Sequence, residues 1–127
     1  MDFRFRPLDL LRITISLLFM IHGIARIFLG IIDDFGIFLS GVGFPLGILF
    51  AWLITIIEIG GSFLLFLNKF VKYLSVYFGF QLLMGIFLVH LKEGWFVVGA
   101  GRNGMEYSVL LILCLAAIFW DNIRTEK

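Results

Sequence analysis

The stretch LLRITISLLFMIHGIARIFLGII, from Leu10 to Ile32, is an apolar run that carries His22 and Arg26 in its second half. A helix rises about 1.5 Å per residue, so roughly 20 residues cross the hydrocarbon layer of a membrane. His22 therefore falls near the middle of the membrane, and Arg26 lies one turn further along on the same side of the helix. An ionisable group at this depth costs about 2.5–3.5 kcal/mol unless it faces a protein interior or a wet cavity. The run predicts a membrane helix whose polar side chains need polar partners on other helices.

The composition excludes a soluble globular domain. Of the 127 residues, 61% are hydrophobic, and the mean hydropathy is +1.08, whereas soluble chains average about 45–50% apolar residues. The net charge of +1 comes without a basic stripe, so nucleic acid is not expected as a partner. Cys114 is the single cysteine and excludes an intramolecular disulfide. The first apolar run is too long for a signal peptide and lacks a small-residue cleavage pattern, so we expect a retained membrane helix.

Three further apolar runs follow the first, and together they predict an all-α membrane protein in which four transmembrane helices form one bundle. Asp9 is expected to be the N-cap of the first helix. The Gly-rich stretch 33–45 is expected to be a connection at the membrane interface, with Pro45 in the first turn of the second helix. The chain is expected to be a single domain, 1–127, with helices at about 10–32, 46–67, 71–91 and 105–121.

Lysine and arginine residues outside the helices predict the orientation in the membrane. Lys92 and Arg102 fall on one side of the membrane, and seven other lysine and arginine residues fall on the opposite side. Because cytoplasmic loops carry an excess of these residues, both termini are expected in the cytoplasm and the two long loops outside. The cations on the predicted cytoplasmic side are Arg4, Arg6, Arg12, Lys69, Lys72, Arg124 and Lys127.

In this topology five ionisable residues lie between the middle of the membrane and its outer face, namely His22, Arg26, Glu58, His90 and Glu106. One reading is structural: Arg26 forms a buried salt bridge with Glu58 or Glu106, and His22 is a hydrogen-bonded core residue. The other reading is a functional site, which intramembrane ionisable residues commonly mark. A metal is not expected, because Arg26 repels a cation and no Glu-x-x-His pair is present. The candidate catalytic residues are His22, Arg26, Glu58 and Glu106; His90, Arg102 and Asn103 are candidate cofactor-binding residues.

On the second helix, small and polar residues recur at steps of three and four and are expected to form its polar face. They are Ala51, Thr55, Glu58 and Ser62.

The start of the last helix offers two local motifs. Asn103 and Glu106 fit a capping box, in which Asn103 is the N-cap and Glu106 is the third helical residue. The stretch 99–104 reads G-x-G-x-x-G, but a dinucleotide site needs a βαβ unit that this pattern does not provide. The glycines are expected to let an outer loop fold over the mouth of the bundle, and an anion bound beside Arg102 is a second reading.

The order and spacing of several short motifs resemble the DoxX family over about residues 10–119. The motifs are His22-Gly23 followed by Arg26, Gly43-Phe44-Pro45, Glu58 among small residues, and Gly104-Met105-Glu106-Tyr107. The resemblance implies a four-helix protein of the cytoplasmic (inner) membrane. The family takes its name from the small membrane subunit of a thiosulfate:quinone oxidoreductase, and other members are linked to thiol and oxidative-stress systems. Matched position by position, it points to His22, Arg26, Glu58 and Glu106.

Two functional hypotheses follow. In the first, the chain is a redox-linked subunit that binds a quinone or a small sulfur compound in an outward-facing polar pocket. No haem, flavin or iron–sulfur motif is present, so this reading needs a partner redox subunit or a cofactor to supply electrons. In the second, the chain is a non-catalytic membrane module that binds a small molecule, anchors partners or forms a homo-oligomer. A transporter or channel is disfavoured, because the polar groups offer no continuous path to the cytoplasm.

Overall fold

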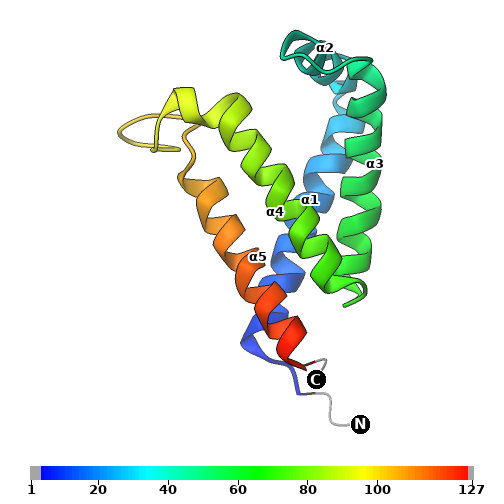
Figure 1. Cartoon of the computed structure of the whole chain (residues 1–127), viewed down its shortest axis with the longest axis vertical. Helices are drawn as coiled ribbons and strands as arrows, with labels where there is room; N and C mark the ends of the chain where they lie inside the picture. Colours follow the sequence, from blue (N-terminus) through cyan, green and yellow to red (C-terminus); the bar gives the residue numbers. More distant parts are fainter. Residues whose placement is uncertain (1–3, 126–127) are drawn as a thin grey trace. The chain divides into compact units, whose positions relative to one another are not determined.

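The computed structural model describes residues 4–125, and every regular element within them is helical. Four helical segments in this range are long and apolar enough to cross a membrane, which confirms the all-α class with four candidate transmembrane helices. The orientation of the termini stays a prediction, and Lys127, one of its cations, lies outside the described residues. The elements are α1 (Pro7–Phe28), α2 (Ile32–Gly41), α3 (Gly47–Phe66), α4 (Val71–Gly85), the π-helix η1 (Ile86–His90), the 3₁₀ turn η2 (Leu91–Glu93) and α5 (Glu106–Thr125) (Figure 1).

The described residues form two compact units. The first, called here the N-terminal unit, comprises residues 13–69 and contains most of α1 with α2 and α3. The second, called the C-terminal unit, comprises residues 4–12 with 70–125 and contains the start of α1 with α4 and α5. That residues 1–127 act as one domain stays a prediction.

The helix α2 corrects the predicted interface connection. The first helix ends at Phe28 rather than near residue 32, and a separate helix begins at Ile32. Ile32, Gly36 and Leu39 are buried at steps of four and three, which is the spacing of one helix face. Two aspartates in the first turn of α2 are favoured by the positive end of the helix dipole. Much of the stretch that suggested a connection is therefore an amphipathic helix.

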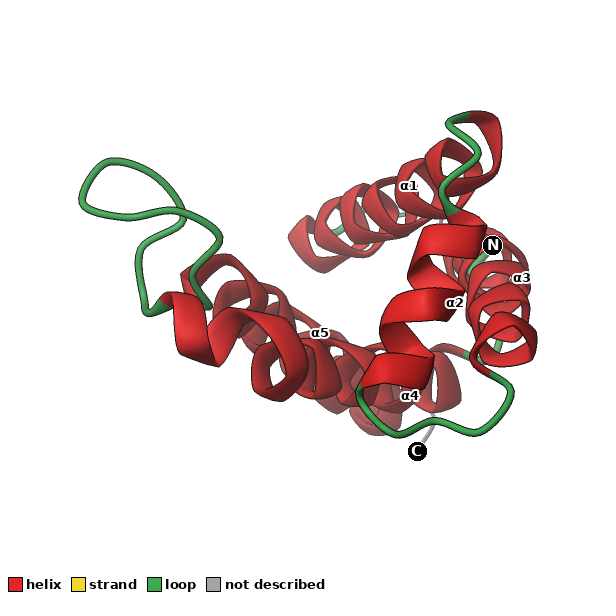
Figure 2. Ribbon diagram, turned by 90° about the horizontal axis from the view of Figure 1, so that it is seen from above, coloured by secondary structure: helices red, strands yellow, loops and turns green. Residues whose placement is uncertain are grey.

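Two glycines hold α2 against the start of α3 in the N-terminal unit (Figure 2). A Cβ atom on Gly36 would lie 2.8 Å from the Cα of Ile48. A Cβ on Gly47 would overlap the carbonyl of Gly36 and the hydroxyl of Ser40. The two backbones meet at a distance that only glycine permits, so α2 is fixed across the start of α3. Because α3 begins at Gly47, Pro45 precedes this helix instead of lying in its first turn as predicted.

In the C-terminal unit, α4 and α5 lie side by side (Figures 1 and 2). The third predicted helix is regular only to Gly85 and continues as the π-helix that ends at His90. Such π segments are rare and recur at functional sites.

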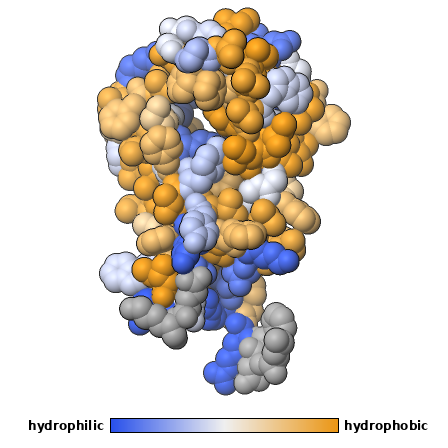
Figure 3. Space-filling model, turned by 45° about the vertical axis from the view of Figure 1, so that its right-hand side comes forward, coloured by the Kyte–Doolittle hydropathy of each residue, from blue (hydrophilic) through white to orange (hydrophobic). Residues whose placement is uncertain are grey.

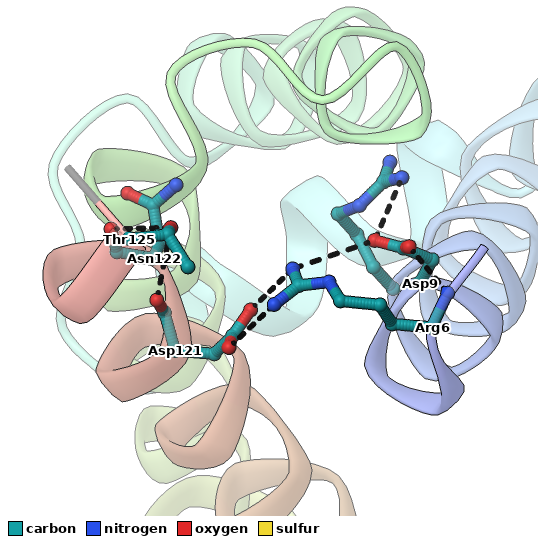
Figure 4. A network of polar contacts seen from close by, with 6 residues as sticks. Arg6, Asp9, Asp121, Asn122 and Thr125 are labelled. Carbon is teal, nitrogen blue, oxygen red and sulfur yellow. Dashed lines mark hydrogen bonds and ion pairs between the residues drawn. The ribbon is translucent and has the colours of Figure 1, made fainter. Parts of the chain in front are cut away.

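The start of α1 is joined to the end of α5 by an ion pair (Figure 4). Arg6 donates two parallel hydrogen bonds to the carboxylate of Asp121, at 2.9 and 2.7 Å. This hydrogen bonding raises the pKa of Arg6 above its ordinary value. The predicted N-cap is wrong: α1 begins at Pro7, and Asp9, its third residue, accepts a hydrogen bond from the backbone N–H of Arg6 at 2.8 Å. Asp9 thus takes the position that the glutamate of a capping box occupies.

Apolar side chains cover most of the face shown in Figure 3. Large hydrophobic residues are exposed on every candidate transmembrane helix, among them Ile21, Leu53, Phe80 and Leu113. Such a surface is stable in lipid and not in water.

Candidate functional site

The polar centre of the N-terminal unit is the side chain of Arg26 in the last turn of α1. Its Nη1 atom donates to Glu58 Oε2 at 3.1 Å and to Thr55 Oγ1 at 3.0 Å, both on α3. The Thr55 hydroxyl in turn donates to the backbone carbonyl of Ala51 at 2.7 Å. The side chain of Glu58 is 3% exposed and that of Arg26 is 17% exposed. The structure therefore realises one of the two salt bridges that the sequence left open, Arg26 with Glu58.

The local sequence explains why these groups meet. Gly23 precedes Arg26 by nearly one turn, and a Cβ on it would lie 2.6 Å from Cγ1 of Ile59 on α3. The missing side chain lets α1 approach α3 closely at this level. The residues predicted to form the polar face of the second helix are all buried, namely Ala51, Thr55, Glu58 and Ser62.

An aromatic ring completes the surroundings of the guanidinium. The Arg26 Cζ atom lies 4.8 Å from the centroid of the Phe35 ring, which is close enough for a cation–π interaction. Phe35 belongs to α2, whose position is fixed by its contact with α3. Sequence reasoning missed Phe35 because the segment was interpreted as a connection. It also missed the role of Thr55, although the three-residue step to Glu58 places both side chains on one face of α3.

The guanidinium of Arg26 keeps donors that the protein does not use. Both of its hydrogen bonds to residues within 4–125 come from Nη1, while arginine has five N–H donors. None of its nitrogen atoms is among the buried side-chain atoms that lack a partner in this range. The side chain of Arg26 is 17% exposed, so the residues around it do not cover it completely.

His22 does not join this cluster. It lies one turn before Arg26 on the same helix, but its side chain is exposed, and the hydrogen bonds of Arg26 go to Glu58 and Thr55. The interpretation of His22 as a hydrogen-bonded core residue is therefore wrong for the described residues. Its role as a proton carrier stays a prediction.

The other candidates belong to the C-terminal unit. His90 Nδ1 lies 2.7 Å from the backbone carbonyl of Asn103, and since a carbonyl only accepts, Nδ1 is the donor. In the neutral ring Nε2 then carries the lone pair. Arg102 is exposed on the loop that precedes α5.

The predicted capping box is wrong. Helix α5 begins at Glu106, which is therefore its first residue rather than its third. The Oε1 atom of Glu106 accepts a hydrogen bond from the backbone N–H of Val97 at 3.0 Å. Asn103 has a φ of 56°, which is the left-handed region and not the extended backbone of an N-cap. Hydrogen bonds between residues on the two sides of the loop thus take the place of the predicted capping box.

The same bonds fold the glycine-containing loop back on itself. Gly104 N–H donates to the carbonyl of Phe96, and Glu106 N–H donates to that of Trp95, both at 3.0 Å. A Cβ on Gly104 would overlap the backbone of Trp95. The last glycine of the G-x-G-x-x-G stretch thus allows two backbone segments to approach each other closely.

Within residues 4–125, no group of three or more His, Cys, Asp or Glu side chains lies together in a way that could hold a metal ion.

Comparison with known proteins gives one match. The model of the DoxX family matches residues 8–91, which is more than half of the chain. The matched range contains His22, Arg26, Glu58 and His90, and it ends before Arg102, Asn103 and Glu106. Neither a curated protein nor a solved structure gave a match.

Proposed function

Because the chain belongs to the DoxX family of membrane proteins, we propose that it is a redox-linked subunit that binds a quinone or a small sulfur compound beside the Arg26–Glu58 pair. The observation that supports this most is the guanidinium of Arg26. It is held by a buried carboxylate at 3.1 Å, both of its hydrogen bonds within residues 4–125 come from Nη1, and its side chain is 17% exposed. A reduced quinone headgroup or a sulfur oxyanion presents the negative oxygen atoms that such donors recognise.

Each residue of the cluster has a role in this proposal. Arg26 stabilises the negative charge of the bound, reduced ligand, and Thr55 orients the guanidinium. Glu58 is the buried counter-charge that holds the guanidinium in place. His22, one turn before Arg26 on α1, carries protons to and from the site. Electrons come from a partner redox subunit or its cofactor.

The candidates of the C-terminal unit are proposed separately. His90, Arg102 and Asn103 are the proposed cofactor-binding residues: His90 offers Nε2, because its Nδ1 atom is engaged with the carbonyl of Asn103, and Arg102 adds a positive charge on the loop before α5. Glu106, proposed as a catalytic residue, fixes this loop by accepting a hydrogen bond from the backbone N–H of Val97.

The outward orientation of the site rests on both termini lying in the cytoplasm and the chain residing in the inner membrane, which we include in the proposal. A cysteine introduced at Val98 in a Cys114→Ser background should react with a membrane-impermeant maleimide on intact cells. A cysteine at Thr125 should react only after lysis. Labelling in the reverse order would place the site on the cytoplasmic side and would remove the outward-facing pocket.

Binding tests the proposal directly. Protein in lipid nanodiscs is titrated separately with decylubiquinone and with thiosulfate, and the heat of binding is measured. At least one probe should bind, and Arg26→Gln should weaken it about tenfold or more, because a hydrogen bond to a charged group contributes about 1.5–3 kcal/mol. Lys92→Gln removes an exposed cation elsewhere and is the matched control. Absence of binding of both probes, or unchanged affinity in Arg26→Gln, would contradict the proposal.

The glycines of the transmembrane helices favour a second candidate, a non-catalytic assembly module. Gly60 on α3 and Gly85 on α4 have open space where a Cβ would be, so their backbone is available to a partner helix. In that case alanine at His22, Arg26 and Glu58 would leave the cellular phenotype intact. Leucine at Gly60 or Gly85 would abolish it.

A further inference from the structure

A groove between α4 and α5 of the C-terminal unit is a second candidate site, independent of the Arg26–Glu58 pair. Its volume is about 430 Å³, within the range of small-molecule pockets. On α5 its lining runs from Ile112 to Ile123, which corresponds to about 16 Å of helix and hence to the hydrocarbon depth of one leaflet. The lining is apolar except for Ser75 on α4.

Ser75 is the feature that points to a ligand. The residue is 3% exposed, and its Oγ atom has no hydrogen-bond partner within the described part of the chain. A buried hydroxyl without a partner is unfavourable, so a molecule in the groove that offers an acceptor oxygen would gain that bond. One turn further along α4 is Gly79, where a Cβ would meet open space. The groove therefore has room beside the helix backbone.

Positive charge marks the end of the groove at which α4 begins and α5 ends. Lys72 precedes Ser75 by three residues on α4, and its Nζ atom lies 5.2 Å from the centroid of the Tyr73 ring. Arg124 is exposed and directly follows Ile123, the last lining residue of α5. The carboxylate of Asp121, nearly one turn earlier on α5, is neutralised by its two hydrogen bonds with Arg6.

The cations lie at one end of the groove, the hydroxyl of Ser75 follows, and the rest of the wall is apolar. From this order we infer that the groove is a binding site for an anionic phospholipid. Lys72 and Arg124 hold the phosphate, Ser75 donates to an ester carbonyl about 4.5 Å deeper along the helix, and one acyl chain lies along Gly79 and α5. Basic residues at the ends of transmembrane helices bind anionic headgroups in this way. A second copy of the chain would satisfy the apolar wall but would bring no phosphate to the cations.

Trp120 lines the groove and reports on its occupant. In a Trp52→Phe, Trp95→Phe background it is the sole tryptophan, since the chain has three. The protein is reconstituted in phosphatidylcholine vesicles that contain brominated phosphatidylglycerol or brominated phosphatidylcholine, and quenching of Trp120 gives the ratio of the two binding constants. Each cation should contribute about fivefold to a preference for phosphatidylglycerol. A variant that keeps only Trp52, on α3, is the control for bulk lipid and should give a ratio near one.

The expected losses are specific. Lys72→Gln and Arg124→Gln should each lower the ratio about fivefold, and Gly79→Leu should reduce quenching of Trp120 by both lipids while Gly60→Leu does not. A ratio near one in the parent protein, or a preference that survives in the Lys72→Gln, Arg124→Gln double variant, would overturn the inference. Trp120 that neither lipid quenches in a protein that sediments as a dimer would overturn it as well and assign the groove to a second copy.

Discussion

Removing the charge of Glu58 is the sharpest test of the Arg26–Glu58 cluster. Glu58→Gln keeps the size and an acceptor oxygen but leaves the guanidinium without a counter-charge. Arg26 cannot lose its proton in a protein, so the charge remains inside the unit. The reciprocal variant, Arg26→Gln, is milder because an isolated buried carboxylate can take up a proton. The two variants should therefore differ in their effect on stability, although they break the same bond.

The magnitudes follow from burial. Breaking one partner of a buried ion pair costs about 3–5 kcal/mol. The Arg26 side chain is 17% exposed and keeps its bond to Thr55, so we expect Glu58→Gln to lower the free energy of unfolding by about 2–3 kcal/mol. Arg26→Gln should lower it by about 1–2 kcal/mol. The double variant has no charge left to compensate and should be more stable than the sum predicts, with a coupling energy of about 1–2 kcal/mol.

Reversible unfolding in mixed micelles with increasing sodium dodecyl sulfate, followed by circular dichroism, gives the free energies of the parent protein, both single variants and the double variant. The coupling energy is the decisive number, because it cancels effects of the micelle that are common to all four proteins. A coupling below about 0.5 kcal/mol, or a larger loss in Arg26→Gln than in Glu58→Gln, would refute this account of the pair.

Two further outcomes test the C-terminal unit. Gly104→Ala should lower the free energy of unfolding by about 1–3 kcal/mol, because its Cβ overlaps the backbone of Trp95. Gly60→Ala is the control and should not destabilise the protein, because a Cβ at Gly60 meets open space. Equal melting temperatures of the two variants would contradict the loop geometry. Asp121→Asn should cost less than about 1 kcal/mol, since Arg6 is 45% exposed. This difference should vanish in 1 M salt but persist as pH rises to about 10, because the contribution is lost only as pH passes the raised pKa of Arg6.

The sequence predicted the four membrane helices because a long apolar run is a strong signal in itself. The helix α2 was not predicted because its hydrophobic pattern is short. Only Ile32, Gly36 and Leu39 form its buried face, and glycine is a residue that usually argues against a helix. The π-helix at 86–90 has no sequence signature of comparable strength.

The candidate site was predictable only in part. The depth of Arg26 in its helix predicted a salt bridge with Glu58 or Glu106; the structure shows Glu58 as the partner, and Gly23 between the helices makes this contact possible. The capping-box pattern at Glu106 gave a wrong prediction because it takes only four neighbouring residues into account. The carboxylate binds Val97, nine residues earlier, and a bond across a loop is invisible to a four-residue pattern.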